Sequence, residues 1–125
     1  MPITVLVVDD EEIVRKMLRV VLKGSIDTDY LEANDATEGL KMAREHRGLI
    51  DLLVSDVVMP GRMNGIEMAA RLSQAHQEMK IILMSGYAPE ALKMEPSWQF
   101  IQKPFAASEF RERIESVLAD HMLAA

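Results

Sequence analysis

The sequence predicts an α/β fold in which a doubly wound, mostly parallel sheet carries helices on both faces. Short apolar runs alternate with helical patterns along the chain, which is typical of consecutive βα units. The first run, Ile3–Val8, is rich in β-branched residues, as expected of a strand that is buried on both faces. The chain contains no repeat and no low-complexity linker. We therefore expect one domain over residues 1–125.

The first two predicted helices follow the first two strands. The first helix can end at Gly24, and its predicted apolar face consists of Ile13, Val14, Met17, Leu18, Val20 and Val21. A weaker strand covers about Asp29 to Ala33. Asp35, with Glu38 three residues later, resembles a capping box, which predicts a helix through about His46.

Three further strands and two helices complete the pattern. The strands cover Leu49–Ser55, Lys80–Met84 and Trp98–Gln102. A helix opens at Asn64 or Gly65, and its predicted inward side chains are Ile66, Ala69, Ala70 and Leu72. The last helix shows the strongest pattern, with an apolar side formed by Phe110, Ile114, Val117 and Leu118.

The composition is that of a globular protein and disfavours several functional classes. Of the 125 residues, 49% are hydrophobic, the formal net charge is −6 and cysteine is absent. The acidic balance argues against direct binding of nucleic acid, and the lack of cysteine excludes disulfides and thiolate sites. We expect no membrane span, no signal peptide and a cytoplasmic location, because the apolar runs are short and the start lacks a signal pattern.

Polar side chains stand at the carboxyl ends of the predicted strands. The first strand runs into Asp9 and Asp10, the third ends at Asp56, and the fourth and fifth end at Ser85 and Lys103. Sites in open α/β sheets form at this edge, so we expect the five side chains to converge. The alternative is that each aspartate only caps a helix or turn, as Asp10 would at the start of the first helix.

A shared site would need a cation. Crowded carboxylates repel one another and are costly to desolvate, and a hard divalent ion with oxygen ligands resolves both problems. Mg²⁺ suits a site with few carboxylates and retained waters, and Mn²⁺ is the alternative. The three aspartate charges would then be balanced by one Mg²⁺ and the Lys103 ammonium, which leaves a neutral site able to accept a phosphoryl group.

With these residues in place, the chain resembles the response-regulator receiver domains of two-component and phosphorelay signal transduction. The resemblance runs from Val5 to Leu118 and is carried by Val-Val-Asp9-Asp10, Asp56 with Met59-Pro60-Gly61, Met84-Ser85-Gly86-Tyr87 and Lys103-Pro104-Phe105. The sequences of these motifs are most similar to those of receivers attached to hybrid sensor histidine kinases. The resemblance implies a flavodoxin-like five-stranded parallel sheet with strand order 2-1-3-4-5.

The resemblance also implies a role for each acidic residue. Asp56 would be the phosphoacceptor, taking a phosphoryl group from a kinase phosphohistidine or a small acyl phosphate. Asp10 and Asp56 would bind Mg²⁺ directly and Asp9 mainly through water. The backbone carbonyl of Val58 would be a further ligand. The chain would be a signalling receiver that catalyses only its own phosphorylation and dephosphorylation.

The remaining implied roles concern charge neutralisation and switching. Lys103 would neutralise the phosphoryl oxygens, Ser85 would hydrogen-bond one of them, and Phe100 would turn inward as the switch aromatic. The Lys103-Pro104 bond is expected to be cis. The partner would be a histidine kinase or a histidine phosphotransfer protein, met through the first helix and nearby loops, and a weak homodimer is also conceivable.

The chain departs from the family pattern between the fourth and fifth strands. The interval from Ser85 to Lys103 is shorter than expected by roughly one helical turn of about 3.6 residues. The fourth helix, near Pro89 to Met94, must therefore be short or irregular. Pro96 reinforces this expectation.

Three other functions stay open as alternatives. A metal-dependent phosphatase with an aspartyl-phosphate intermediate usually needs a second acid two residues after the nucleophile, where Val58 stands. A flavodoxin-like FMN binder is disfavoured because residues 9–12 are anionic and contain no glycine. A degenerate receiver that acts only as a protein-interaction module is opposed by the complete set of acids, hydroxyl and lysine.

Overall fold

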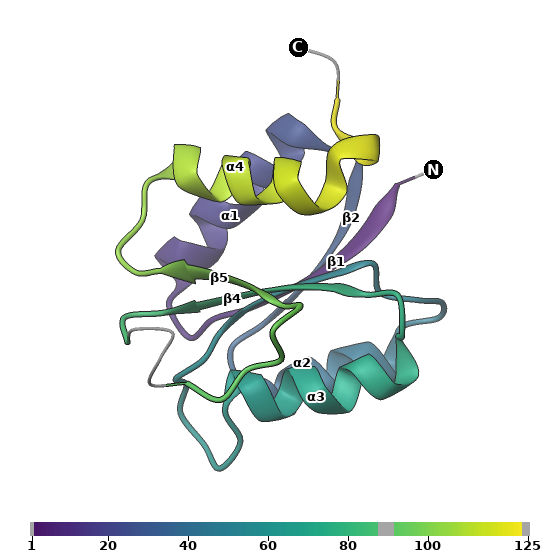
Figure 1. Cartoon of the computed structure of the whole chain (residues 1–125). Helices are drawn as coiled ribbons and strands as arrows, with labels where there is room; N and C mark the ends of the chain where they lie inside the picture. Colours follow the sequence, from purple (N-terminus) through teal and green to yellow (C-terminus); the bar gives the residue numbers. More distant parts are fainter. Residues whose placement is uncertain (1, 88–91, 124–125) are drawn as a thin grey trace.

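The computed structural model describes residues 2–87 and 92–123, in which a five-stranded parallel sheet lies between two layers of helices (Figure 1). The strand order is β2-β1-β3-β4-β5, and every neighbouring pair is parallel. The predicted doubly wound sheet and its order are therefore confirmed. The strands are β1 (Ile3–Val8), β2 (Thr28–Ala33), β3 (Leu52–Asp56), β4 (Lys80–Ser85) and β5 (Gln99–Gln102).

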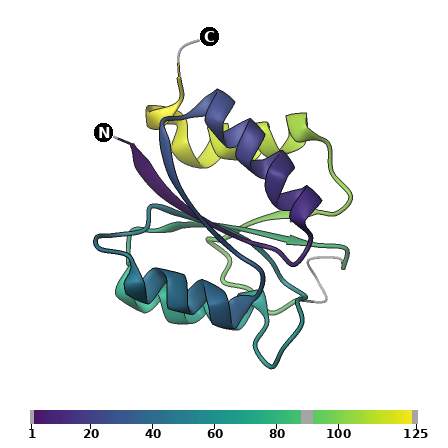
Figure 2. The same cartoon turned by 180° about the vertical axis from the view of Figure 1, so that it is seen from behind.

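The helices divide between the two faces of the sheet. In the described residues they are α1 (Glu12–Ser25), α2 (Ala36–Glu45), α3 (Gly65–Ala75) and α4 (Ala107–Leu118), followed by the short 3₁₀ helix η2 (Ala119–His121). Figures 1 and 2 show α1 and α4 on one face and α2 and α3 on the other. Each parallel crossover thus returns the chain to the same edge of the sheet, so all five strands end at one side.

Alternate side chains of the central strands enter two separate cores. In β1, Val5 and Val7 pack with α1 and α4, whereas Leu6 and Val8 pack with α2 and α3. The strands β3 and β4 repeat this alternation. Burial on both faces explains their almost continuous apolar sequences. Each fully buried side chain of this size contributes about 1.5–3 kcal/mol, so the strands form a firm base for the residues at their ends.

The buried face of α1 differs from the prediction. Its buried residues are Leu18, Leu22 and Ser25, whereas Ile13 is 76% exposed and Val20 is 63% exposed. Each helical residue turns by about 100°, so these two side chains lie roughly 140–180° around the helix from Leu18 and Leu22, on its outer side. The helix also continues past Gly24 and ends at Ser25.

Other boundaries also needed correction. The third strand begins at Leu52 and not at Leu49, whose side chain is exposed. In α3 the inward position predicted for Ala70 is taken by Met68, which is fully buried while Ala70 is exposed. The fifth strand starts at Gln99, one residue after the predicted start at Trp98. Short apolar runs extend into loops in these cases, and periodicity alone does not locate the ends of elements.

The connection between β4 and β5 is irregular where it is described. Residues 86–87 and 92–98 contain no helix, which agrees with the predicted shortening. The rest of the predicted fourth helix, residues 88–91, lies outside the described residues. Leu92, Met94 and Trp98 pack, partly buried, against the core on the α2 and α3 side. An irregular segment thus contributes side chains to the core on this face.

Candidate functional site

Four strands deliver polar side chains to the carboxyl edge of the sheet. Asp9 follows β1, Asp56 is the last residue of β3, Ser85 is the last residue of β4, and Lys103 follows β5. The parallel register pairs Val8 with Ser55, so Asp9 and Asp56 come next along adjacent strands. The structure brings the aspartates and Lys103 together, as the strand-end positions predict.

The Lys103 ammonium lies between two buried carboxylates. Its Nζ donates to Asp9 Oδ2 at 2.9 Å and to Asp56 Oδ2 at 3.1 Å. The two aspartate side chains are 0% and 10% exposed. Charge-assisted hydrogen bonds of this kind are what make a buried charge tolerable. The Lys103-Pro104 peptide bond is cis, as predicted.

One lysine does not neutralise this cluster. Burial raises the pKa of the Asp56 carboxyl, the hydrogen bond and charge of Lys103 lower it, and the charges of Asp9 and Asp10 raise it again, so the pKa ends above its ordinary value. Burial alone would lower the pKa of Lys103, but its bonds to Asp9 and Asp56 raise it above its ordinary value. The lysine therefore stays charged, and burial remains the largest influence on the Asp56 carboxyl.

The three aspartates have the geometry of a cation site. Asp9, Asp10 and Asp56 each offer a carboxylate oxygen, and these oxygens all lie within 4.8 Å of one another. Oxygen donors of this kind fit a hard divalent ion such as Mg²⁺. Capping does not account for Asp10, because the residue at the N-cap of α1 is Glu11 and it makes no side-chain capping bond.

Ser85 and Phe100 lie on the neighbouring strands. Ser85 is buried, its Oγ accepts a hydrogen bond from the Tyr87 N–H at 3.0 Å, and its carbonyl accepts one from the Lys103 N–H at 2.8 Å. Phe100 is partly buried against the core on the α2 and α3 side. Val58, two residues after Asp56, has an exposed side chain. The serine is thus joined through the main chain to Lys103.

Sequence reasoning missed three residues that support the site. Arg15 Nη1 donates to the main-chain carbonyl of Asp9 at 2.7 Å. Glu11 Oε1 lies 3.6 Å from Lys103 Nζ. Gly65, the first residue of α3, leaves room for the Asp56 main-chain carbonyl, with which a Cβ would collide. The sequence offered one signal, since Arg15 stands one helical turn after Glu11, next to the acidic loop.

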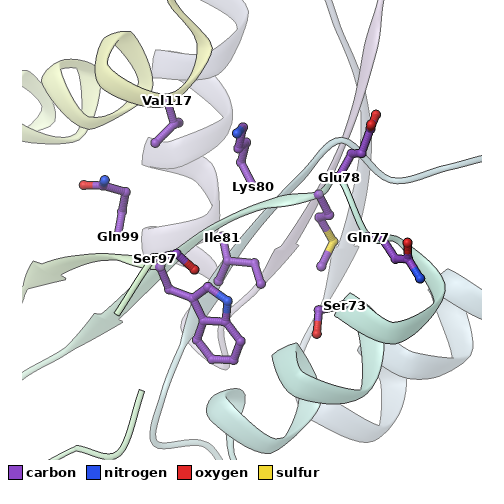
Figure 3. A pocket seen from close by; sticks show the side chains of 10 residues that line it. Ser73, Gln77, Glu78, Lys80, Ile81, Ser97, Gln99 and Val117 are labelled. Carbon is purple, nitrogen blue, oxygen red and sulfur yellow. The ribbon is translucent and has the colours of Figure 1, made fainter. Parts of the chain in front are cut away.

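Hollows lie at both ends of the sheet. Beside Lys103, one of about 420 Å³ has a mostly apolar lining that includes Val14, Met17 and Phe105. Another of about 570 Å³ lies at the amino ends of β4 and β5 (Figure 3). There, Ser73 and Gln77 lie on the α3 side, and Lys80 and Val117 lie on the α4 side. The charged cluster at the opposite edge carries the stronger chemical signal, so we assign the site to the carboxyl edge.

No helix among residues 2–87 and 92–123 is long and apolar enough to span a bilayer.

Comparisons with known proteins identify one signalling family. The family described as response regulator receiver domain matches residues 5–115. The sensor kinase CckA of Brucella abortus (strain 2308) is 35% identical over 119 residues, which are 92% of this chain and 12% of the kinase. The chemotaxis protein CheY of Pseudomonas aeruginosa is 30% identical over 119 residues, with 90% of this chain and 94% of CheY covered.

A solved structure supports the same assignment. The crystal structure of the receiver domain from the hybrid histidine kinase CckA has a TM-score of 0.69 and 32% identity, and the match covers 92% of this chain and 98% of that domain. The chain therefore spans a small part of a sensor kinase but nearly the whole of a receiver domain.

Proposed function

Since this chain belongs to the response regulator receiver family, whose members are signalling domains of two-component systems, we propose that it accepts a phosphoryl group on Asp56 in a Mg²⁺-dependent reaction. One observation carries the proposal. The Asp56 carboxylate is held 3.1 Å from the Lys103 ammonium and lies in a cluster of three carboxylates that can bind a cation. A merely structural acid would not need this arrangement.

The chemistry follows from the positions of the charged groups. An ionised Asp56 oxygen attacks the phosphorus of a phosphohistidine or an acyl phosphate, while the bond to the imidazole nitrogen or acyl oxygen breaks. Lys103 already contacts Asp56, so its ammonium is placed to bind a phosphoryl oxygen after transfer. Phosphoryl transfer depends mainly on such positioning and electrostatic stabilisation.

The cation would be held by residues at the same edge. Asp10 and Asp56 would bind it directly, Asp9 through water because both its oxygens already accept hydrogen bonds, and Val58 through its backbone carbonyl. When bound, Mg²⁺ would neutralise charge on the phosphoryl oxygens. Burial, followed by the charges of Asp9 and Asp10, raises the pKa of Asp56 despite Lys103, and a bound cation would offset the cost of the ionised carboxylate.

We place the switch at Ser85 and Phe100. The Ser85 Oγ accepts from Tyr87 N–H, and a hydroxyl that accepts one bond still has a proton to donate. That proton can bond a phosphoryl oxygen on Asp56. The movement of Ser85 would allow Phe100 to turn inward and would shift the balance between two surface arrangements.

A phosphohistidine donor needs a surface beside Asp56 on which to dock. The hollow next to Lys103 is lined by Val14, Met17 and Phe105, and Ile13 is 76% exposed nearby on α1. An apolar surface beside the reactive group suits a protein partner. We propose that a histidine kinase or a histidine phosphotransfer protein binds here.

Intact mass spectrometry after incubation with acetyl phosphate tests the proposal. We expect a gain of one phosphoryl group that depends on Mg²⁺ and is absent from Asp56→Asn. The matched control is Asp51→Asn, because Asp51 stands directly before the same strand, at its other end. Failure with both acetyl phosphate and a histidine-phosphorylated donor would instead favour a protein-interaction module without phosphotransfer.

A further inference from the structure

The Arg15 guanidinium contacts two groups next to the acidic loop, residues 9–12. Its Nη1 donates to the Asp9 main-chain carbonyl at 2.7 Å, and its Nε lies 3.8 Å from Glu32 Oε1. The Arg15 side chain is only 15% exposed. A guanidinium buried to this degree and bonded in two directions has little freedom to move.

Asp9 is held by hydrogen bonds in four directions. Its N–H donates to the Ala33 carbonyl at 3.2 Å, Oδ1 accepts from the Glu11 N–H at 2.8 Å, and Oδ2 accepts from Lys103. The fourth bond, from Arg15, acts on the carbonyl of the peptide that joins Asp9 to Asp10. A peptide unit is planar, so the direction of this carbonyl also sets the direction in which the chain enters Asp10.

Asp10 depends on its main chain for its position because its side chain is exposed. Rotation of the Asp9–Asp10 peptide would move the Asp10 carboxylate relative to Asp56. The bond from Arg15 opposes that rotation. Ligand groups of metal sites are commonly oriented by outer partners in this way.

Glu32 in turn braces Arg15 from the adjacent strand. Glu32 is the next-to-last residue of β2, and its Oε2 accepts a 2.6 Å hydrogen bond from Arg19 Nη1. Two arginines of α1 therefore share one carboxylate, but the bond to Asp9 is made by Arg15. This difference makes Arg19 a control for the charge of Arg15.

We propose that Arg15 is a positioning residue, which holds the Asp9–Asp10 peptide so that Asp10 points into the cation site. This inference rests on the proposed function. The direction in which removal of Arg15 changes the affinity for Mg²⁺ tests this inference. If Arg15 acted through its charge alone, it would repel a divalent cation, and its removal would tighten Mg²⁺ binding. A positioning residue does the opposite, and its removal weakens binding.

The experiment is a Mg²⁺ titration of the unphosphorylated protein, followed through the Asp10 amide signal in NMR spectra. We expect Arg15→Met to weaken Mg²⁺ binding about tenfold, at the lower end of the range for outer partners of metal ligands. Arg15→Lys should restore part of the affinity, and Arg19→Met, which removes the same charge, should stay within about twofold of the wild type. Unchanged or tighter binding by Arg15→Met would overturn the inference.

A double variant tests whether Arg15 acts through Asp10. If it does, Arg15→Met should cost much less affinity in an Asp10→Asn background than in the wild type, because coupled residues are not additive. Equal losses in both backgrounds would contradict the inference. If a urea titration shows that Arg15→Met is unfolded, Arg15→Lys is tested in its place. We expect Arg15→Lys to weaken Mg²⁺ binding about threefold, because an ammonium does not reproduce the forked donor geometry of a guanidinium.

The inference and the proposed function fail in different ways. A wild-type protein without Mg²⁺ binding would overturn the proposed cation site and this inference together. Normal Mg²⁺ binding and phosphorylation by the wild type, with equal Mg²⁺ affinity in Arg15→Met, would overturn the inference alone.

Discussion

The two ends of the sheet contain the same kinds of residue in different surroundings. At the carboxyl end, Asp56 is 7% exposed and bonds the Lys103 ammonium, which is itself shared with Asp9. At the amino end, Asp51 precedes β3, Lys80 is the first residue of the neighbouring strand β4, and both are exposed. There the Asp51 carboxylate accepts from the Thr4 N–H at 2.8 Å, a bond that joins it to the neighbouring strand β1.

The difference shows that the burial of the charged side chains and their close approach to one another, and not the residue types alone, distinguish the site. At the amino end a carboxylate needs no cation, because water solvates it and a backbone N–H bonds it. At the carboxyl end three carboxylates lie close together, and the two buried ones, Asp9 and Asp56, share one lysine. Matched substitutions at the two ends can therefore separate the effect of location from the effect of residue type.

The largest difference is expected between the two lysines. We predict that Lys103→Ala slows phosphorylation by acetyl phosphate about 10²-fold, the loss typical when one donor to a developing anion is removed. Mg²⁺ binding should stay largely intact, since the aspartates remain. Lys80→Ala should leave the rate unchanged. The rates can be measured by intact mass spectrometry over a time course.

The same variant tests the coupling between phosphorylation and the switch. After prolonged phosphorylation of Lys103→Ala, the Phe100 ring should keep its unphosphorylated position, because the contact that joins Lys103 to the phosphoryl group is gone. NMR signals of the Phe100 ring report this directly. Normal rearrangement of Phe100 in Lys103→Ala would show that the lysine is not part of the switch.

Two glycines, Gly65 near the site and Gly24 far from it, allow a comparison of the free energy of unfolding. At Gly65 a Cβ would collide with the Asp56 main-chain carbonyl and lie 2.9 Å from Ser55 Oγ. We expect Gly65→Ala to lower the free energy of unfolding by about 2 kcal/mol, as overpacking does. Gly24, in the last turn of α1, has open space around the Cβ position, and Gly24→Ala should raise stability by about 0.5 kcal/mol.

Urea unfolding of both glycine variants measures these changes. The Gly65→Ala variant should also be phosphorylated more slowly, because the displaced carbonyl belongs to the phosphoacceptor. Equal stability of the two variants would mean that α3 shifts away from Asp56 at little cost. In that case the close approach at Gly65 would not be needed to place the site.

Patterns within the sequence predicted those parts of the fold that depend on local periodicity. Continuous apolar runs identified the buried strands, and their polar ends located Asp9, Asp56 and Lys103 at one edge. The predicted face was wrong for Ile13 and Val20, which are exposed, because these apolar residues lie on the outer side of α1, away from Leu18 and Leu22. The strand order came from the family resemblance, since periodicity does not determine which strands are neighbours.

Contacts that depend on packing were beyond the sequence. The bond from Arg15 to the Asp9 carbonyl exists because α1 packs against the ends of β1 and β2. The close approach of Gly65 to the Asp56 carbonyl exists because α3 begins directly against the end of β3. Neither contact belongs to a sequence motif that would identify the contacting residue. Main-chain groups carry no signature in the sequence, so their side-chain partners can be found only in three dimensions.

The last predicted effect concerns the charge of Asp56 itself. Burial, opposed by Lys103 and reinforced by Asp9 and Asp10, raises its pKa above the ordinary 3.8. A carboxyl whose pKa is higher in the folded than in the unfolded state makes folding less favourable when it is ionised. Without Mg²⁺, Asp56→Asn should therefore raise the free energy of unfolding at pH 7, because the ionised carboxyl no longer opposes folding. Asp51→Asn should change it by less than about 0.5 kcal/mol.

The pH dependence gives this prediction its sign. The advantage of Asp56→Asn over the wild type should be complete above the folded pKa of Asp56 and should vanish as the pH falls through that value toward 3.8. Saturating Mg²⁺ should stabilise the wild type more than the variant, because the cation supplies the charge that the carboxylates lack. Urea unfolding at several pH values, with EDTA or Mg²⁺, measures both effects. An advantage that grew on acidification would mean that Lys103 alone neutralises Asp56, and that the carboxyl edge, like the amino end, needs no added cation.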